Sequence, residues 1–150
     1  MNDSEPLRPM ENQEGNGYRL DAQIGFLLRK ANQRHLTIFA DEIAEVTPRQ
    51  FAALARLLEM GPLSQNRLGR ETAMDAATIK GVIGRLLTKK LVETQADPSD
   101  RRRLTVSLTE MGARFIQSCL PHAQKISEAT LAPLTPGEAH QLLSLIAKLT

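Results

Sequence analysis

The chain has 150 residues, of which 41% are hydrophobic and 24% are charged, a composition that favours one domain with a core of its own. No apolar run reaches the ~18–20 residues that a membrane-spanning helix needs, and the first residues lack the basic-then-apolar pattern of a secretory signal. The single cysteine, Cys119, has no partner for an internal disulfide, which favours a reducing compartment. We therefore expect a cytoplasmic protein with no membrane partner.

Basic residues are concentrated in the middle of the chain. Between Arg49 and Arg114 lie 12 Lys or Arg and 7 Asp or Glu, a net charge of +5, whereas the remaining 7 basic and 10 acidic residues give −3. A positive segment inside a nearly neutral chain suits a surface that binds phosphate groups. An asymmetry of this size also arises by chance, so the charge alone decides little.

The first predicted elements are a disordered polar tail over residues 1–17 and a long helix over residues 18–45. The tail carries four acidic residues against one basic residue, and such a polar segment is typical of disorder. The helix is indicated by polar and apolar residues that recur at steps of four and three, which is one helical stripe; its members are Ile24, Leu28, Ala31, His35 and Ile38.

Three further helices are predicted from their capping residues. Thr47 followed by Pro48 begins a second helix, which Gly61 and Pro62 end. Ser64 caps a short third helix, and Asp75 caps a fourth. The buried face of the fourth helix is indicated by apolar residues at helical spacing: Ile79, Val82, Ile83, Leu86 and Leu87.

The hydrophobic period then changes to that of a hairpin. A short strand is expected over residues 91–94 and a second over 104–108, with turn residues at 97–100 between them. A long helix over about 110–131 and a last helix after Thr135 and Pro136 complete the chain. This order predicts a mainly α fold with a small β-hairpin wing, a winged helix-turn-helix with long flanking helices.

The fourth helix is the candidate for reading DNA, because the second helix of a helix-turn-helix enters the major groove by its N-terminus. Thr78, Lys80 and Arg85 are the predicted contacts to base edges and phosphates. Ser64 and Gln65, at the start of the third helix, are predicted to contact phosphates. The alternative is an ordinary amphipathic helix whose polar face is solvated.

The hairpin loop carries three consecutive arginines. Arg101, Arg102 and Arg103 form a narrow positive projection that suits the focused negative potential of a minor groove. Asp100 is expected to orient one guanidinium through a bidentate ion pair. The alternative is a charged turn that only protects a sheet edge.

Residues 63–112 resemble the multiple-antibiotic-resistance-regulator (MarR) family of winged-helix repressors. The resemblance rests on the run from Asp97 to Arg102 and on the following segment, residues 104–112. It implies a homodimer in which residues 18–46 and 110–150 form the dimerisation helices. It further implies that residues 47–109 bind a pseudo-palindromic operator in double-stranded DNA.

A narrower likeness, over residues 61–83, is to a branch of that family that controls the catabolism of aromatic compounds. It implies a repressor that an aromatic acid or an aromatic acyl-CoA releases from DNA. Effector pockets in the family lie between the dimerisation helices and the winged domain. A carboxylate favours Arg or His, and a ring favours Phe, so the candidate effector residues are Arg29, Arg34, His35 and Phe39. A core histidine and solvated arginines are the alternatives.

The same residues bear on three other kinds of protein. Redox sensing through Cys119 is the first, but family members that sense peroxides carry their cysteine in the first helix, whereas Cys119 follows the wing. A helical dimeric interaction module without specific DNA binding is the second, and it would leave the arginines of the loop without a role. An enzyme is not expected, because His35, His122 and His140 are scattered and no phosphate-binding or metal-binding motif is present; no cofactor and no metal are predicted.

Overall fold

The computed structural model describes residues 17–150, so the tail predicted over residues 1–17 lies, apart from Gly17, outside the described residues. These residues fall into two compact units, 17–33 and 34–150, whose boundary lies within helix α1 (Ile24–Glu42). The first unit also contains a 3-10 turn, η1 (Leu20–Ala22). Within this unit Ile24 and Leu28 are exposed.

The start and the end of the first helix differ from the prediction, which placed it over residues 18–45. The helix begins at Ile24, after the η1 turn, and ends at Glu42. The buried face of its second half is formed by Phe39, followed by Ile43 just beyond the helix. Two members of the predicted stripe lie in the second unit. Ile38 packs against the core, and His35 is half-buried. The pattern therefore identified the helix but not the face that packs within this chain.

Helix α2 (Pro48–Met60) begins with the predicted cap. The Thr47 hydroxyl accepts a hydrogen bond from the Gln50 amide at 3.2 Å, and the Gln50 side chain accepts one from the Thr47 amide at 3.2 Å. This reciprocal arrangement satisfies two amides that a helix start leaves unpaired. Gly61 ends the helix at φ 75°, a conformation that glycine adopts without strain.

Helices α3 (Gln65–Glu71) and α4 (Ala76–Thr88) form the predicted helix pair. Ser64 and Asp75 are their N-caps, with side chains that accept hydrogen bonds from the amides of Arg67 and Thr78. The turn between the helices is closed by a hydrogen bond from the Met74 amide to the Gly69 carbonyl at 2.8 Å. These contacts fix the start of α4 relative to α3.

A three-stranded antiparallel sheet replaces the two-stranded hairpin of the prediction. Strands β1 (Leu63–Ser64), β2 (Val92–Ala96) and β3 (Leu104–Leu108) lie in the order β1-β3-β2. Strand β2 starts one residue later than predicted, because the Leu91 amide still bonds to the Leu86 carbonyl at the end of α4. Strand β1 has only two residues, too few for a visible alternation.

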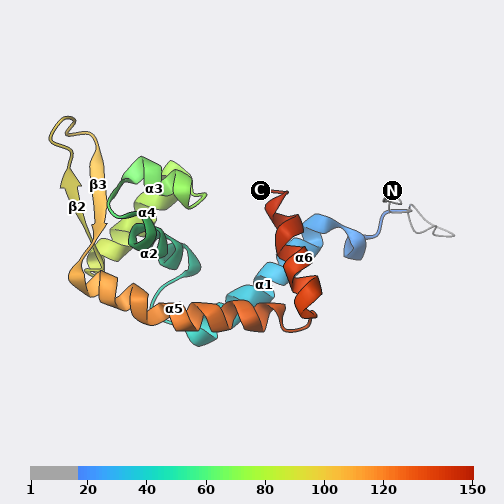
Figure 1. Ribbon diagram of the computed structural model, residues 1–150. Coiled ribbons are helices and arrows are strands. Elements are labelled where there is room, and N and C mark those ends of the chain that lie inside the picture. The colour runs from blue at the N-terminus through green and yellow to red at the C-terminus, as the bar shows by residue number, and fades with distance from the viewer. Residues whose placement is uncertain (1–16) are drawn as a thin grey trace, which may run out of the picture. The chain divides into compact units, whose positions relative to one another are not determined.

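Helices α5 (Glu110–Leu131) and α6 (Pro136–Ala147) complete the second unit, with Thr109 and Thr135 as their N-caps. Figure 1 shows the β2–β3 hairpin projecting beyond α3 and α4. The core joins the end of α1, the helices α2 to α5 and the sheet; its most deeply buried side chains are Ile43, Leu54, Leu68, Ile79, Leu86, Val106 and Ile116. In contrast, α6 contains no buried residue. Among residues 17–150, no helix is both long and apolar enough to cross a membrane.

Candidate nucleic-acid interface

Helix α4 presents one buried face and one open face. Its predicted apolar residues Ile79, Val82, Ile83 and Leu86 are buried, whereas Leu87 is 39% exposed. Lys80 and Arg85 are exposed and Thr78 is half-buried. The open face also contains the exposed small residues Ala76, Ala77, Gly81 and Gly84. Because small side chains let a backbone approach a groove floor, this face suits close contact with DNA. The two glycines are an addition to the predicted site.

The N-cap of α4 makes the carboxylate of Asp75 unusually acidic. Hydrogen bonds from Thr78, first from its side chain and then from its amide, hold the pKa of Asp75 below its ordinary value of 3.8. A lowered pKa in the folded state means that the ionised carboxylate stabilises the fold above the unfolded pKa. This contribution is lost as the pH falls through the lower, folded-state pKa.

We therefore expect the amide proton of Thr78 to titrate in NMR spectra with a midpoint below pH 3.8. Asp75→Asn keeps a capping side chain without the carboxylate, so the same amide should show no such step. A midpoint at or above the ordinary pKa of aspartate would contradict the assigned cap.

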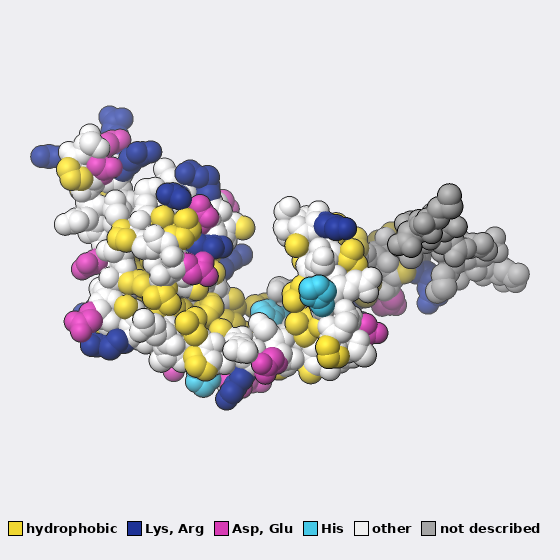
Figure 2. Space-filling model, viewed as in Figure 1, with side chains coloured by type: hydrophobic (Ala, Val, Ile, Leu, Met, Phe, Trp, Pro, Cys, Tyr) yellow, Lys and Arg dark blue, Asp and Glu magenta, His cyan; other side chains and the backbone are white. Residues whose placement is uncertain are grey.

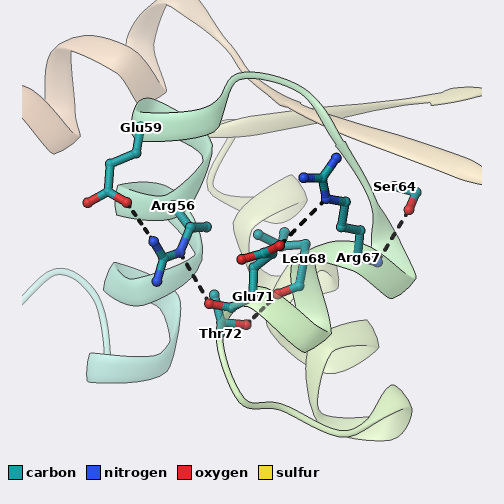
Figure 3. Close-up of polar contacts among 7 residues, drawn as sticks. All are labelled: Arg56, Glu59, Ser64, Arg67, Leu68, Glu71 and Thr72. Carbon is teal, nitrogen blue, oxygen red and sulfur yellow. Dashed lines mark hydrogen bonds and ion pairs between the residues drawn. The ribbon is translucent and has the colours of Figure 1, made fainter. Parts of the chain in front are cut away.

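Arg56 of α2 is bonded to the end of α3, and a second arginine, Arg67, pairs within α3, as Figure 3 shows. The Arg56 Nε donates to the Glu71 carbonyl at 3.1 Å, and its Nη1 pairs with Glu59 at 2.8 Å. Arg67 lies 3.6 Å from the Glu71 carboxylate. These exposed pairs contribute little stability, but the bond to the end of α3 fixes the helix that supports α4.

The wing loop, residues 97–103, is shaped by short-range hydrogen bonds. The Asp97 carboxylate accepts from the Ser99 amide at 2.9 Å and from its hydroxyl at 2.7 Å. These two bonds lower the pKa of Asp97. Asp97 and Arg103 also pair through their backbones at 2.9 Å, which closes the loop. The sequence predicts Asp97 only as a turn residue, whereas in the structure its carboxylate and backbone both organise the loop.

The arginines of the wing loop are exposed, and Asp100 acts differently from the prediction. Arg101, Arg102 and Arg103 are all exposed, and Figure 2 shows Lys and Arg side chains gathered at the tip of the hairpin. Asp100 Oδ1 accepts a hydrogen bond from the Arg102 amide at 3.0 Å. Within the described part of the chain no ion pair joins Asp100 to a guanidinium, so the predicted bidentate pair is wrong. Asp100 shapes the backbone from which the arginines project.

Two predicted effector residues bind the end of α5. Arg34 donates to the carbonyls of Ala129 and Thr130 at 2.8 and 2.6 Å, and His35 Nδ1 lies 2.9 Å from the Thr130 hydroxyl. A cation at the C-terminus of a helix satisfies unpaired carbonyls and complements the helix dipole. In the first unit, the Arg29 guanidinium lies over the Phe26 ring, 5.5 Å from its centroid. All three side chains are thus engaged within the chain.

A pocket separate from Arg29, Arg34 and His35 lies between the end of α1, the start of α2 and the end of α4. It is open to solvent, has a volume of about 600 Å³ and is lined mainly by apolar side chains. Of the four predicted effector residues, only Phe39 lines it, and that ring packs edge-on against Phe51 with centroids 5.9 Å apart. Arg85 and Lys89 bring positive charge to the pocket from α4, and Lys89 Nζ donates to the Glu45 carbonyl.

The remaining candidates for chemistry are a buried thiol and a histidine that already has a carboxylate partner. Cys119 is 5% exposed, and burial raises the pKa of its thiol, which disfavours the reactive thiolate. His122 pairs with Glu42 at 3.1 Å. Among the residues that the structure describes, no group of three His, Cys, Asp or Glu could hold a metal ion.

Known proteins resemble this chain in sequence and in fold. Residues 44–103 match the model of the MarR family. The HTH-type transcriptional repressor NicR of Pseudomonas putida is 42% identical over 134 residues, which cover 88% of this chain and 85% of that protein. These findings agree with the predicted family and with the expectation of a regulator instead of an enzyme.

Solved structures share the winged-helix fold. A probable transcriptional regulator from Pseudomonas aeruginosa is 51% identical and superposes with a TM-score of 0.84, covering 88% of this chain and 100% of that one. BpsR of Bordetella bronchiseptica, whose DNA binding is regulated by 6-hydroxynicotinic acid, is 37% identical with a TM-score of 0.84, covering 88% and 96% of the two chains. The chain is therefore a member of the MarR family of transcriptional regulators.

Proposed function

We propose that this regulator represses genes for the catabolism of an aromatic compound and leaves its operator when a small aromatic acid binds. The observation that carries the proposal is the arrangement of the open face of α4 and the arginine-bearing wing loop on one core. Strand β3 pairs with β2 on one side and with β1, just before α3, on the other. The likeness to NicR, named a repressor, and to BpsR supports the finer assignment.

The DNA contacts follow from this arrangement. The open face of α4, with Thr78, Lys80 and Arg85, enters the major groove. The wing loop reaches the flanking backbone and minor groove. Residues 47–109 are then the DNA-binding region.

The protein binds DNA as a homodimer. Its two copies contact each other through residues 18–46 and 110–150. Helix α6 supplies the strongest argument, because none of its residues is buried by the rest of residues 17–150. Leu143 is 57% exposed and Leu149, just beyond the helix, is 71% exposed. A second copy that covers this face places two α4 helices on a pseudo-palindromic operator, with half-sites about 34–36 Å apart. Sedimentation equilibrium should give twice the mass of the chain.

Binding to the DNA upstream of the protein's own gene tests the proposal. Fluorescence anisotropy with that duplex and with a scrambled duplex of equal length, at two salt concentrations, separates sequence-specific from charge-driven binding. We expect a preference for the upstream DNA that survives the higher salt. Equal binding to both duplexes that disappears with salt would favour the helical interaction module.

The effector is proposed to bind in the pocket between α1, α2 and α4. Its apolar lining and the ring of Phe39 suit an aromatic ring, while Arg85 and Lys89 suit a carboxylate. Because Arg85 lies in α4 and Lys89 caps its C-terminus, an anion at the pocket changes the forces on the helix that contacts DNA. Effector binding would then favour a dimer whose α4 helices do not match the operator. A cytoplasmic location is part of the proposal.

Replacing Lys89 with methionine should weaken the response to the effector by about 10-fold or more, because a charge-assisted hydrogen bond contributes ~1.5–3 kcal/mol. The measurement is the concentration of aromatic acid, from a panel that includes 6-hydroxynicotinic acid, that releases half of the bound DNA. Ala40→Phe, which fills the pocket without changing a charge, should have the same effect.

Arg34→Met is the matched control for Lys89→Met. Arg34 is also a cation bound to backbone carbonyls, but it does not line the pocket. Its response to the acid should stay within a factor of two to three of the wild type. If Arg34→Met loses the response and Lys89→Met keeps it, the effector binds at the candidates Arg34 and His35 named from the sequence, which lie beside the end of α5.

A further inference from the structure

The base of the wing loop and the first turn of α3 enclose a small polar cleft outside the pocket described above. Its volume is about 60 Å³, and it is lined by Ser64, Gln65, Asn66, Arg102, Arg103 and Leu104. Five of these six side chains are polar, and two are positively charged. Such a lining excludes an apolar guest and favours a compact anion.

The register of the sheet explains why residues so far apart in sequence meet here. Thr105 pairs with Ser64 across β1 and β3, and Arg103 lies two residues before Thr105. Because β1 and β3 are antiparallel, Leu104 and Arg103 run back toward Gln65 and Asn66 at the start of α3, and all four line the cleft. Its backbone pair with Asp97 fixes it at the base of the loop, whereas Arg101 lies nearer the tip.

The donors of the cleft are free. Within residues 17–150, the side chains of Gln65, Asn66, Arg102 and Arg103 make no hydrogen bond to another group of the protein. The Ser64 hydroxyl accepts from the Arg67 amide at 3.2 Å, so its proton remains available for donation. The nearby carboxylate of Asp97 attracts Arg103 electrostatically, but its hydrogen bonds come from Ser99.

We propose that this cleft holds one phosphodiester group of the DNA backbone, with Arg103 and Asn66 as its main ligands. The inference rests on the proposed function, because the anion it names belongs to the operator. The cleft lies between α3 and the wing loop. In the proposed complex, the DNA backbone that separates the major groove at α4 from the minor groove at the wing passes this position. Arg103 is thereby assigned to the backbone, and Arg102 also lines the cleft, so Arg101 is the arginine that the proposal leaves for the minor groove. Phosphate contacts of this kind fix the register of a protein on its duplex.

Ethylation interference tests the inference directly. Phosphates of the upstream duplex are ethylated at random, and DNA bound by wild type, Arg103→Ala and Asn66→Ala is compared with unbound DNA. Both variants should lose interference at the same phosphate in each half-site. Each should bind about 10-fold more weakly, and Arg103→Ala should reduce the salt slope by about 0.9 for each phosphate contact that is lost.

Two control variants separate this site from a general loss of charge. Arg101→Ala removes an arginine from the same loop and should retain interference at the phosphate in question. Arg114→Ala removes an arginine that pairs with Glu110 on α5 at 2.9 Å, and it should bind DNA like the wild type.

The inference is overturned if Arg103→Ala and Asn66→Ala keep the wild-type pattern, or lose interference at different phosphates. An unchanged pattern together with a response of the Asn66 side-chain amide to inorganic phosphate in NMR spectra would mean a site for free phosphate, and this also overturns it. Failure of the proposed function gives a different result, since the wild type itself would then show no preference for the upstream duplex.

Discussion

Replacing Gly112 with alanine should destabilise the protein by about 3 kcal/mol, the largest loss that we expect from adding a single carbon. Gly112 lies in the first turn of α5, and a Cβ there would stand 1.8 Å from the carbonyl oxygen of Leu91 and 2.8 Å from its carbonyl carbon. That carbonyl also accepts the Thr109 amide at 3.1 Å. Because a backbone group cannot turn aside as a side chain can, α5 must move away from the end of α4.

Urea unfolding followed by circular dichroism measures this effect, at one protein concentration because dimer stability depends on concentration. Gly84→Ala is the matched control, since a Cβ at Gly84 meets nothing within 4 Å. It should be neutral or raise the stability by about 0.5–1 kcal/mol, because glycine inside a helix costs that amount relative to alanine. Equal midpoints for Gly112→Ala and the wild type would show that α5 and Leu91 do not make this close approach.

The fold was largely predictable because its helices begin at residues with a strong local signal. Thr47, Ser64, Asp75 and Thr135 were each expected at a helix start, and each accepts an amide hydrogen bond there. A cap acts over three residues, so the sequence contains all the information needed to recognise it. The alternation from Leu104 to Leu108 likewise identified β3 correctly.

Features set by distant contacts were not predictable. Strand β1 exists because β3 pairs with Leu63 and Ser64, more than forty positions away in the chain. The close approach of Gly112 to Leu91 also depends on how α5 packs, and in the sequence Gly112 was visible only as part of a family pattern. Short elements and close backbone contacts produce no periodic pattern of apolar residues that could be detected in the sequence.

The residue types of the DNA site were predictable, but the partners of those residues were not. The exposed arginines of the wing loop were expected, whereas the bond of Asp100 to a backbone amide was not, because a carboxylate beside arginines suggests an ion pair first. Similarly, Arg34 suggested a ligand for a carboxylate, and it instead binds carbonyls almost a hundred residues away. Charge is visible in a sequence, but the competition between internal and external partners is decided by packing.

Removing all three arginines of the wing loop together should reduce operator affinity by about 1,000-fold, the largest effect on DNA binding that we expect. Arg101, Arg102 and Arg103 are exposed, so alanine at these positions leaves the core unchanged. Contacts to phosphates and to a narrow minor groove weaken steeply as salt rises. The triple variant should therefore also show a smaller salt dependence, and anisotropy titrations at several salt concentrations measure both quantities.

A variant with alanine at Arg114, Lys125 and Lys148 removes the same charge from exposed positions on α5 and beyond α6. Long-range attraction depends on total charge and is screened beyond about 8–10 Å at physiological salt, so this variant should lose no more than a few-fold in affinity. Its mass in sedimentation must remain that of the wild type, because α6 belongs to the proposed dimer interface. If both triple variants lost the same operator affinity, the wing loop would contribute only through its net charge and not through direct contacts. A loss confined to the wing variant would mean that its arginines contact the DNA directly, as proposed.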